Sequence, residues 1–195
     1  GGEIPLRSAL KGRMNASNIM AAVGACLVMG LPPDAIEKGV SSLKGVPGRM
    51  EAVPNARGLM ILVDYAHTPA ALDAALTNAR ALTGGRLMVV FGCGGDRDRT
   101  KRPVMGSIAA ARADVVFVTS DNPRSEDPMD IIRDIVSGVP GGANVVVEPD
   151  RARAIRTAID AMNPQDCLVI AGKGHEDYQV VGVTRIPFDD RSCVR

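Results

Sequence analysis

The residues best suited to chemistry gather in one glycine-rich stretch, residues 91–103, with the sequence FGCGGDRDRTKRP. An apolar run ends there at Phe91, and six of the seven residues 96–102 are charged. Glycines let a backbone approach a ligand closely, and the start of a helix attracts anions through its free N–H groups. A buried strand followed by such a turn and a helix is typical of the ligand-binding edge of an α/β sheet.

Three further polar clusters follow apolar runs in the same way. They are residues 64–69 (DYAHTP), 119–127 (TSDNPRSED) and 171–178 (AGKGHEDY). If the apolar runs are parallel strands, all four clusters meet at the carboxyl edge of one sheet. A single cluster of this kind is most simply a solvated loop. Four of them, which carry both histidines of the chain, predict a functional cleft.

The charged residues of these clusters indicate what the cleft could bind. Five basic side chains suit a carboxylate or a phosphate, namely Arg97, Arg99, Lys101, Arg102 and Arg124. Three acidic side chains suit an ammonium group or a metal ion, namely Asp64, Asp121 and Glu176. A cleft with both signs of charge fits a zwitterion such as an amino acid. Each arginine taken alone could equally form a surface ion pair.

Several sharper motifs are missing from the sequence. There is no GxxxxGK[ST] phosphate loop, no GxGxxG dinucleotide turn, no HExxH zinc motif and no GxSxG nucleophile elbow. For His67 and His175 an ordinary structural role is the simpler interpretation. The residues alone therefore predict a mixed-charge cleft without a complete catalytic apparatus and without a metal site.

The elements that must position these clusters alternate along the chain. Apolar runs predict strands at residues 59–63, 87–91, 115–118, 145–147 and 168–170, with a terminal hairpin within residues 179–188. Helical spacing of apolar residues predicts helices that begin near residues 68, 103, 128 and 150. Short apolar strands separated by helices predict an α/β fold, with a mostly parallel sheet covered by helices on both faces.

The first 46 residues follow a different pattern. Two helices are expected at residues 15–29 and 34–43. Residues 45–58 then hold two prolines and three glycines without any periodicity. We therefore expect a domain boundary at about residue 46, between a first domain over residues 1–46 and a second over residues 47–195.

Composition limits the classes of protein that fit. A net charge of +1 and an aromatic content of 3% give no reason to expect nucleic acid or an anionic membrane as a partner. No apolar run approaches the roughly 20 residues that span a bilayer, and the start lacks the apolar core of a signal peptide. Four scattered cysteines without a CxxC pair fit a reduced, cytoplasmic protein.

The quoted clusters resemble the motifs of the Mur ligases. The matching segments, in the family's order, are residues 48–51 (GRME), 64–69, 91–103, 121–124 (DNPR) and 172–179. Residues 12–18 (GRMNASN) resemble a segment near the end of the family's central, ATP-binding domain. The resemblance implies a Rossmann-like C-terminal domain, preceded by a short helical remnant of the central domain.

The resemblance also implies an activity. In this family ATP phosphorylates a carboxylate, and an incoming amine attacks the acyl phosphate to form an amide. The motifs are most similar to those of the members that add meso-diaminopimelate to UDP-N-acetylmuramoyl-L-alanyl-D-glutamate in peptidoglycan synthesis. The full-length protein is therefore expected to be a cytoplasmic, monomeric ligase that uses ATP and Mg²⁺.

Parts of the family pattern have no counterpart in this sequence. They are the family's phosphate loop, its carbamylated lysine, most of its magnesium ligands and its UDP-binding N-terminal domain. The chain is therefore expected to be a fragment that is inactive alone. Its partners would be the missing N-terminal and central domains together with the small-molecule substrates.

Carried over position by position, the resemblance implies two sets of site residues. The set for meso-diaminopimelate is Arg97, Asp121, Asn122, Pro123, Arg124, Gly172 and Glu176. The set for ATP is Asn15, Asn18, Arg49, Asp64 and His67. Arg124 would pair with the distal carboxylate that distinguishes diaminopimelate from lysine, and Glu176 with an ammonium group. Asn15 would also serve as a helix cap, and His67 is the one candidate catalytic residue.

Two alternatives stay open at this point. The chain could be a stand-alone, non-catalytic module that binds an amino acid or an anion. It could also belong to a sibling ligase that uses L-lysine or another amino acid. The intact Asp-Asn-Pro-Arg sequence at residues 121–124 argues against the second alternative, although Arg124 alone does not fix specificity.

Overall fold

The computed structural model describes residues 3–10 and 13–195. The chain forms two compact units, Gly1–Val46 and Pro47–Arg195. Of the segment 12–18, residue 12 lies outside the described residues. No helix in the described part of the chain is both long enough and apolar enough to cross a membrane.

The first unit is a pair of helices, α1 (Arg13–Val28) and α2 (Pro33–Ser42). Both helices were expected, within about two residues of these bounds. Pro33 begins α2 because a proline at the first helical position costs no hydrogen bond. Asn15 lies in the first turn of α1, which begins at Arg13.

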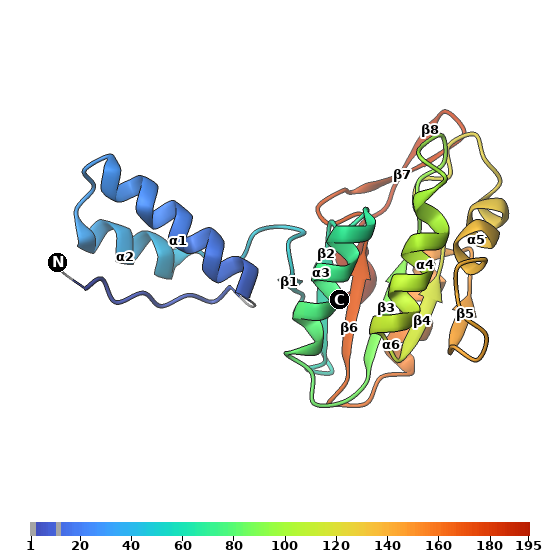
Figure 1. Ribbon diagram of the computed structural model, residues 1–195, viewed down its shortest axis with the longest axis horizontal. Coiled ribbons are helices and arrows are strands. Elements are labelled where there is room, and N and C mark those ends of the chain that lie inside the picture. The colour runs from blue at the N-terminus through green and yellow to red at the C-terminus, as the bar shows by residue number, and fades with distance from the viewer. Residues whose placement is uncertain (1–2, 11–12) are drawn as a thin grey trace. The chain divides into compact units, whose positions relative to one another are not determined.

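The second unit is built on a six-stranded sheet with the order β1-β2-β6-β3-β4-β5 (Figure 1). Its strands are β1 (Glu51–Ala52), β2 (Met60–Asp64), β3 (Leu87–Phe91), β4 (Val115–Val118), β5 (Val145–Val147) and β6 (Cys167–Ala171). Only β1 runs antiparallel to its neighbour, so the predicted mostly parallel sheet is confirmed. The short strand β1, within the segment without periodicity, was not predicted.

Helices cover both faces of this sheet, as expected. One face carries α3 (Pro69–Arg80), α4 (Lys101–Arg112) and α5 (Pro128–Val136), and the other carries α6 (Arg151–Asp160) and α7 (Asp190–Val194) (Figure 1). Helix α4 begins two residues before the expected Pro103, and the short helix α7 was not predicted.

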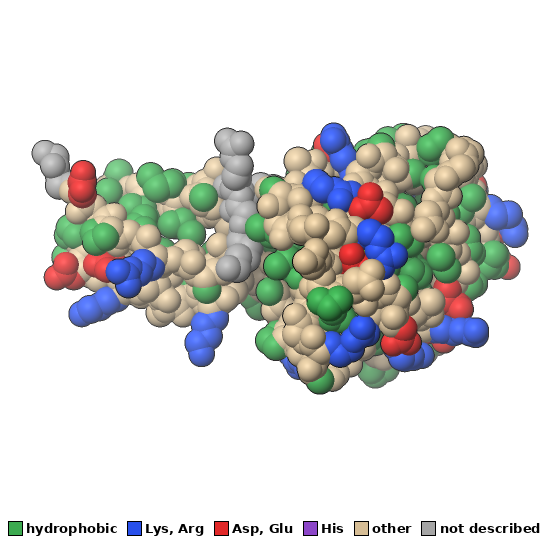
Figure 2. Space-filling view, turned by 90° about the horizontal axis from the view of Figure 1, so that it is seen from below, with side chains coloured by type: hydrophobic (Ala, Val, Ile, Leu, Met, Phe, Trp, Pro, Cys, Tyr) green, Lys and Arg blue, Asp and Glu red, His purple; other side chains and the backbone are tan. Residues whose placement is uncertain are grey.

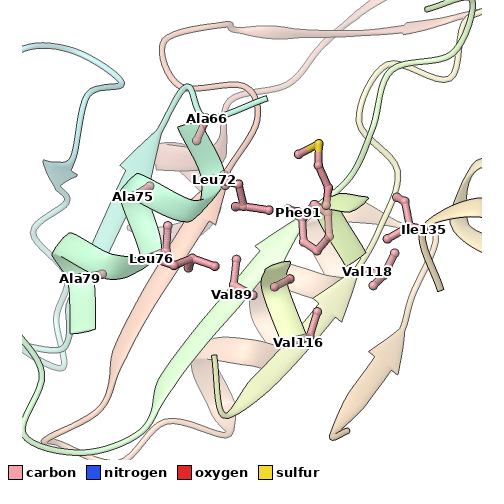
Figure 3. Close-up of a cluster of buried hydrophobic side chains, with 14 of the residues drawn as sticks. Ala66, Leu72, Ala75, Leu76, Ala79, Val89, Phe91, Val116, Val118 and Ile135 are labelled. Atoms are coloured by element: carbon pink, nitrogen blue, oxygen red, sulfur yellow. The ribbon is translucent and has the colours of Figure 1, made fainter. Parts of the chain in front are cut away.

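The core forms around the two middle strands. The register aligns Leu62, Val169, Val89 and Val116 in one row across four strands, and this row packs against helix α3 and its neighbours (Figure 3). Strands β3 and β6 are buried along their whole length. Burial on both faces explains why these strands read as continuous apolar runs rather than alternating patterns.

Side-chain caps fix where the loops turn into helices. The Thr68 hydroxyl accepts a hydrogen bond from the Ala71 N–H at the start of α3. Asp127 caps α5 and Asp150 caps α6 in the same way. Each such cap contributes about 1 kcal/mol and satisfies a backbone N–H that the helix leaves free. The loops between strand and helix therefore have defined ends.

The predicted terminal hairpin is present as β7 (Tyr178–Val181) and β8 (Thr184–Pro187). It is attached to the loop after β4 through backbone hydrogen bonds. Arg124 N–H donates to the Val180 carbonyl oxygen at 3.0 Å, and Gly182 N–H donates to the Arg124 carbonyl oxygen at 2.7 Å. These bonds hold Arg124 in the left-handed region, with φ of 52°.

Candidate functional site

A cleft of about 540 Å³ opens at the carboxyl edge of the sheet. All four polar clusters contribute to its lining, which consists of Tyr65, His67, Thr68, Gly94, Arg97, Asp98, Lys101, Asp121, Asn122, Arg124, Gly172, Glu176 and Tyr178. The loops therefore converge as parallel strands require. Of the seven residues expected around the amino acid, only Pro123 does not line the cleft.

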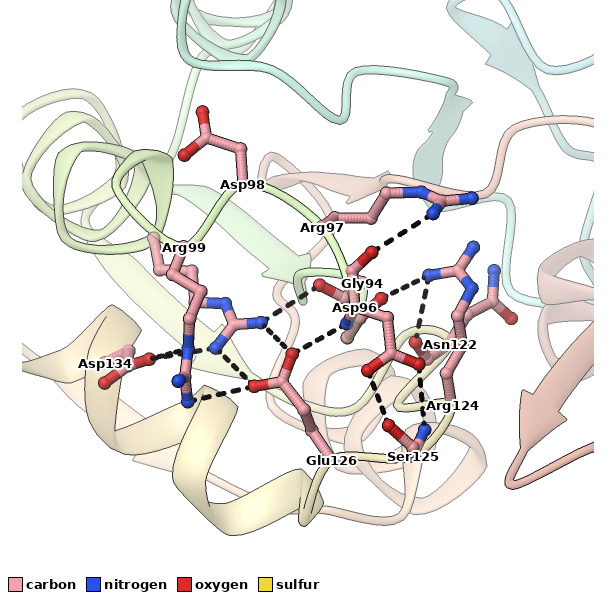
Figure 4. Close-up of polar contacts among 12 residues, drawn as sticks. Gly94, Asp96, Arg97, Asp98, Arg99, Asn122, Arg124, Ser125, Glu126 and Asp134 are labelled. Carbon is pink, nitrogen blue, oxygen red and sulfur yellow. Dashed lines mark hydrogen bonds and ion pairs between the residues drawn. The ribbon is translucent and has the colours of Figure 1, made fainter.

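Two arginines of the cleft have no carboxylate partner in the described part of the chain. Arg124 Nη1 donates to the Gly95 carbonyl oxygen at 2.7 Å, and Arg97 Nη1 donates to the Asp96 carbonyl oxygen at 3.1 Å. Their guanidinium groups point to the same side of the loops (Figure 4). The remaining N–H donors of these two side chains suit a carboxylate or a phosphate.

Two other arginines have a different role from the one expected. Arg102 is fully buried and donates to Glu126 at 2.8 and 2.9 Å and to Asp134 at 2.9 Å. Arg99 lies 3.0 Å from Glu126. The interpretation of Arg99 and Arg102 as anion-binding residues of the cleft is not supported, because neither lines the cleft and both pair with carboxylates of the protein. Hydrogen bonding to Arg102 lowers the pKa of Glu126 to about 2.

The loops after β3 and β4 are tied together beside the two cleft arginines (Figure 4). The Asp96 carboxylate accepts bonds from Ser125 Oγ at 2.6 Å and Ser125 N–H at 3.2 Å, while Asp96 N–H donates to Glu126 at 2.7 Å. A side chain at Gly95 would overlap the Pro123 carbonyl oxygen. Pro123 therefore supports the site through its backbone, and the two loops position Arg97 and Arg124 together.

The acidic residues form a second cluster in the cleft. Glu176 Oε2 accepts a hydrogen bond from Asn122 Nδ2 at 3.1 Å. Asp121 Oδ1 lies 3.0 Å from Lys173 Nζ. Gly172 has φ of +115°, and a Cβ there would lie 3.2 Å from Asp121 Oδ2. Glycine is therefore favoured at position 172, chiefly because other residues rarely adopt this backbone conformation, and a Cβ there would also be a tight contact with Asp121.

Sequence reasoning missed Lys173. Its side chain is fully buried and bonds to Asn122 of the loop after β4 and to Tyr178 at the start of β7. It belongs to the AGKGHEDY cluster, but nothing in the sequence indicates burial, because lysine side chains are almost always exposed. Lys101 also differs from a free cation, since its Nζ donates to the His67 carbonyl oxygen at 2.7 Å.

The residues expected to contact ATP are distributed over both units. Asn15 and Asn18 belong to the first unit, where they help to line an apolar groove of about 350 Å³. In the second unit the Arg49 guanidinium lies 5.0 Å from the centre of the Tyr65 ring, and the His67 ring packs edge-on against the same ring at 4.6 Å. Of these expected residues, only His67 lines the cleft.

Asp64, also expected near ATP, is buried and bonded to the backbone. Its Oδ2 accepts from Met50 N–H at 2.8 Å and its Oδ1 from Ala66 N–H at 2.9 Å. Burial raises the pKa of Asp64, and these two bonds oppose that rise. Oδ2 therefore holds the turn at residues 48–50 next to the end of β2, and Oδ1 fixes the loop that follows β2. Among the described residues, no three His, Cys, Asp or Glu side chains are grouped to hold a metal ion.

Known sequences are similar to this chain. Residues 48–174 match the family described as "Mur ligase, glutamate ligase domain". Over its whole length the chain is 53% identical to the UDP-N-acetylmuramoyl-L-alanyl-D-glutamate–2,6-diaminopimelate ligase of Synechococcus elongatus, and 52% identical to that of Gloeobacter violaceus. The chain spans 39% and 40% of the lengths of these two relatives.

Solved structures share the fold. A structure of a UDP-N-acetylmuramoyl-L-alanyl-D-glutamate–2,6-diaminopimelate ligase has a TM-score of 0.76 and 41% identity, covering 97% of this chain and 39% of the other. The folylpolyglutamate synthase of Thermotoga maritima has a TM-score of 0.65 over 86% of this chain and 37% of the other, with 23% identity. The second likeness shows a common fold and nothing further.

Proposed function

The chain belongs to the Mur ligase family, and from this premise we propose that it is part of the ligase that adds meso-diaminopimelate to UDP-N-acetylmuramoyl-L-alanyl-D-glutamate. The proposal covers the whole protein, of which this chain spans about 40% in the curated relatives. The unit Pro47–Arg195 would supply the amino-acid pocket, and the unit Gly1–Val46 the end of the ATP-binding domain.

The observation that carries this proposal is the division of charge in the cleft. Arg97 and Arg124 present cationic donors without carboxylate partners in the described chain, and Glu176 and Asn122 present a carboxylate and an amide. Each end of meso-diaminopimelate carries one carboxylate and one ammonium group. A carboxylate would bind Arg124, and an ammonium group would bind Glu176. L-Lysine lacks the distal carboxylate and would leave a desolvated arginine unpaired.

ATP and Mg²⁺ are the proposed cofactors of the complete enzyme. The Arg49 guanidinium beside Tyr65 and the exposed His67 suits the anionic part of a nucleotide. Asn15 and Asn18 would contact the adenine from the first unit. Asp64 would contribute by holding the turn that carries Arg49, because its two oxygens already accept backbone hydrogen bonds.

We further propose that the complete protein works as a cytoplasmic monomer. ATP would activate the D-glutamate carboxylate as an acyl phosphate, which the amine of the bound diamino acid would attack. Neither this step nor the binding of the UDP-linked substrate is assigned to residues of this chain. A stand-alone binding module and a lysine-using sibling are the competing functions.

An NMR titration of the chain with meso-diaminopimelate tests the proposal, with L-lysine as the matched control ligand. We expect saturable shifts at Arg97, Asn122, Arg124 and Glu176 with meso-diaminopimelate and much weaker shifts with L-lysine. An equal response to L-lysine would favour the lysine-using sibling. No response to either ligand would contradict an amino-acid site formed by this unit alone.

A further inference from the structure

We infer that Lys173, to which the proposed function gives no role, sets the orientation and the charge of the acidic cluster in the cleft. The inference rests on the proposed function because it concerns the same site. Lys173 follows Gly172 directly after β6, and its side chain is fully buried. A buried ammonium group is costly unless its charge is matched and its hydrogens are bonded.

The Lys173 ammonium group connects three segments of the chain. Its Nζ donates to Asn122 Oδ1 at 3.0 Å and to the Tyr178 carbonyl oxygen at 2.8 Å. It also lies 3.0 Å from Asp121 Oδ1 and 3.7 Å from Glu176 Oε2. One cation therefore joins the loop after β4, the loop after β6 and the start of β7.

These contacts determine which way the Asn122 amide faces. Asn122 Oδ1 accepts bonds from Lys173 Nζ and from Val180 N–H at 2.9 Å, and both of these groups can only donate. The amide nitrogen must then face the opposite way, where it donates to Glu176 Oε2 at 3.1 Å. One N–H of Asn122 and Glu176 Oε1 are used by none of the described contacts. These two atoms are placed for a ligand.

Lys173 also sets the charge of the cluster. Asp121 and Glu176 bring two negative charges and Lys173 brings one positive charge, so one negative charge remains. Arg151, the other buried cation near Asp121, does not change this sum because Asp190 pairs with it at 2.8 Å. One net negative charge matches one ammonium group. Lys173 therefore neutralises Asp121 and leaves Glu176 as the carboxylate that binds the amino acid.

Two variants separate the charge of Lys173 from its volume. Lys173→Met keeps a side chain of similar length without the charge, and Lys173→Ala leaves space that added ethylammonium can refill with a charge. Lys44→Met is the control, because Lys44 is exposed in the first unit. The measurement is the affinity for meso-diaminopimelate, followed by NMR together with the signals of the Asn122 side-chain amide and the Val180 N–H.

We expect Lys173→Met to weaken binding about tenfold or more and to shift both sets of signals, while Lys44→Met changes neither. Ethylammonium should restore part of the binding of Lys173→Ala, and ethanol should not, because the missing component is the charge. A folded Lys173→Met variant that binds as tightly as the parent and keeps its Asn122 signals would overturn the inference.

The outcomes also separate this inference from the proposed function. If the parent chain does not bind meso-diaminopimelate, the proposed site fails, and the ligand-free spectra then decide the role of Lys173. Unchanged Asn122 and Val180 signals in Lys173→Met would contradict it. If neither Lys173 variant folds, the parent is tested by reductive methylation. Lys173 must react far more slowly than Lys44, and equal reactivity would contradict its buried contacts.

Discussion

At the scale of single residues, the arginines of the second unit have two different roles, one structural and one in binding a ligand. Arg102 and Arg151 are fully buried, and carboxylates of the protein match their charges. Among the described residues, Arg97 and Arg124 donate hydrogen bonds only to backbone carbonyl oxygens. The first pair holds the loops in place, and the second pair is available for an anion. Burial and partners, rather than residue type, distinguish the two roles.

Arg124→Ala should weaken binding of meso-diaminopimelate by roughly 2–5 kcal/mol, the usual loss for one partner of a desolvated charge pair. Binding of L-lysine should change little, since it has no second carboxylate. Calorimetric titration measures both values. Arg153→Ala is the matched control, because Arg153 is 72% exposed and outside the cleft. Undiminished binding of meso-diaminopimelate by Arg124→Ala would contradict the proposed contact.

Glu126 should make the second unit sensitive to acid. Its pKa in the folded state is about 2, below the ordinary value of 4.5, chiefly through hydrogen bonding to Arg102. A carboxyl group whose pKa is lower in the folded than in the unfolded state stabilises the fold at pH values above its unfolded pKa. This stabilisation is lost as the pH falls from about 5 to 2, towards the pKa of the folded state. Glu126→Gln should therefore lower the free energy of unfolding by about 1–3 kcal/mol at pH 7 and by almost nothing at pH 2.

Urea denaturation at several pH values measures the effect of Glu126→Gln. Glu148→Gln serves as the control, because Glu148 pairs with the exposed Arg153 and should contribute little. A difference between Glu126→Gln and the parent that stays constant from pH 7 to pH 2 would show that the ion pair is not its cause.

At the scale of elements, most strands and helices could be predicted from the sequence, because the residues that they bury are apolar and recur in a recognisable pattern. Strands such as β3 and β6 are apolar throughout because both of their faces are covered. The position of β6 between β2 and β3 was not predicted. Strand order depends on contacts between segments far apart in the chain, and apolar runs of similar composition do not encode their neighbours. The same limit explains the unpredicted strand β1.

The candidate site was predictable in part for a related reason. Convergence of the four loops follows from parallel strands, so Arg97, Asn122 and Glu176 could be placed at one edge. The burial of Lys173 and Arg102 could not be foreseen, because long charged side chains are usually exposed. Their partners come from other loops, and only the folded structure brings them together.

Helices α4 and α5 pack so closely that the residue of α4 at their contact must be a glycine. A Cβ at Gly106 of α4 would overlap the Ile135 carbonyl oxygen of α5. Gly106→Ala should lower the free energy of unfolding by about 1–3 kcal/mol, although alanine is the better helix former. Gly24→Ala in α1 should instead stabilise its helix by roughly 0.5–1 kcal/mol, because nothing lies within 4 Å of the added methyl group.

Urea denaturation measures the first glycine variant, and helical circular dichroism on heating measures the second. The same glycine-to-alanine change is therefore expected to destabilise the fold at residue 106 and to stabilise the helix at residue 24. A Gly106→Ala variant as stable as the parent would contradict the close packing of α4 on α5.

At the scale of the whole molecule, the two units differ in how much apolar surface they bury. In the described part of the first unit, only Val23 and Ile36 are buried apolar residues. Seven of its large apolar side chains are exposed, namely Met20, Leu27, Val28, Met29, Leu31, Leu43 and Val46. The second unit has two extended cores on the two faces of its sheet. Stability is therefore expected to be unevenly distributed along the chain.

Native-state hydrogen exchange should reveal this difference. Amides of α1 and α2 should exchange through low-energy local openings, whereas those of β3 and β6 should exchange only on unfolding of the whole second unit. The comparison is internal, since both sets of amides are measured in one sample. Equal protection of α1 and β3 would contradict the expectation and indicate that the two units unfold together.

The place of β6 in the sheet has a consequence for synthesis on the ribosome. The chain emerges in the order β2, β3, β4, β5, yet β2 and β3 share no ladder until β6 enters between them. Until Cys167–Ala171 has left the exit tunnel, both strands present open apolar edges, which are templates for pairing with other nascent chains. The sheet therefore closes only after β6 has been synthesised, and interrupted chains that stop before residue 167 should be substrates for chaperones and proteases.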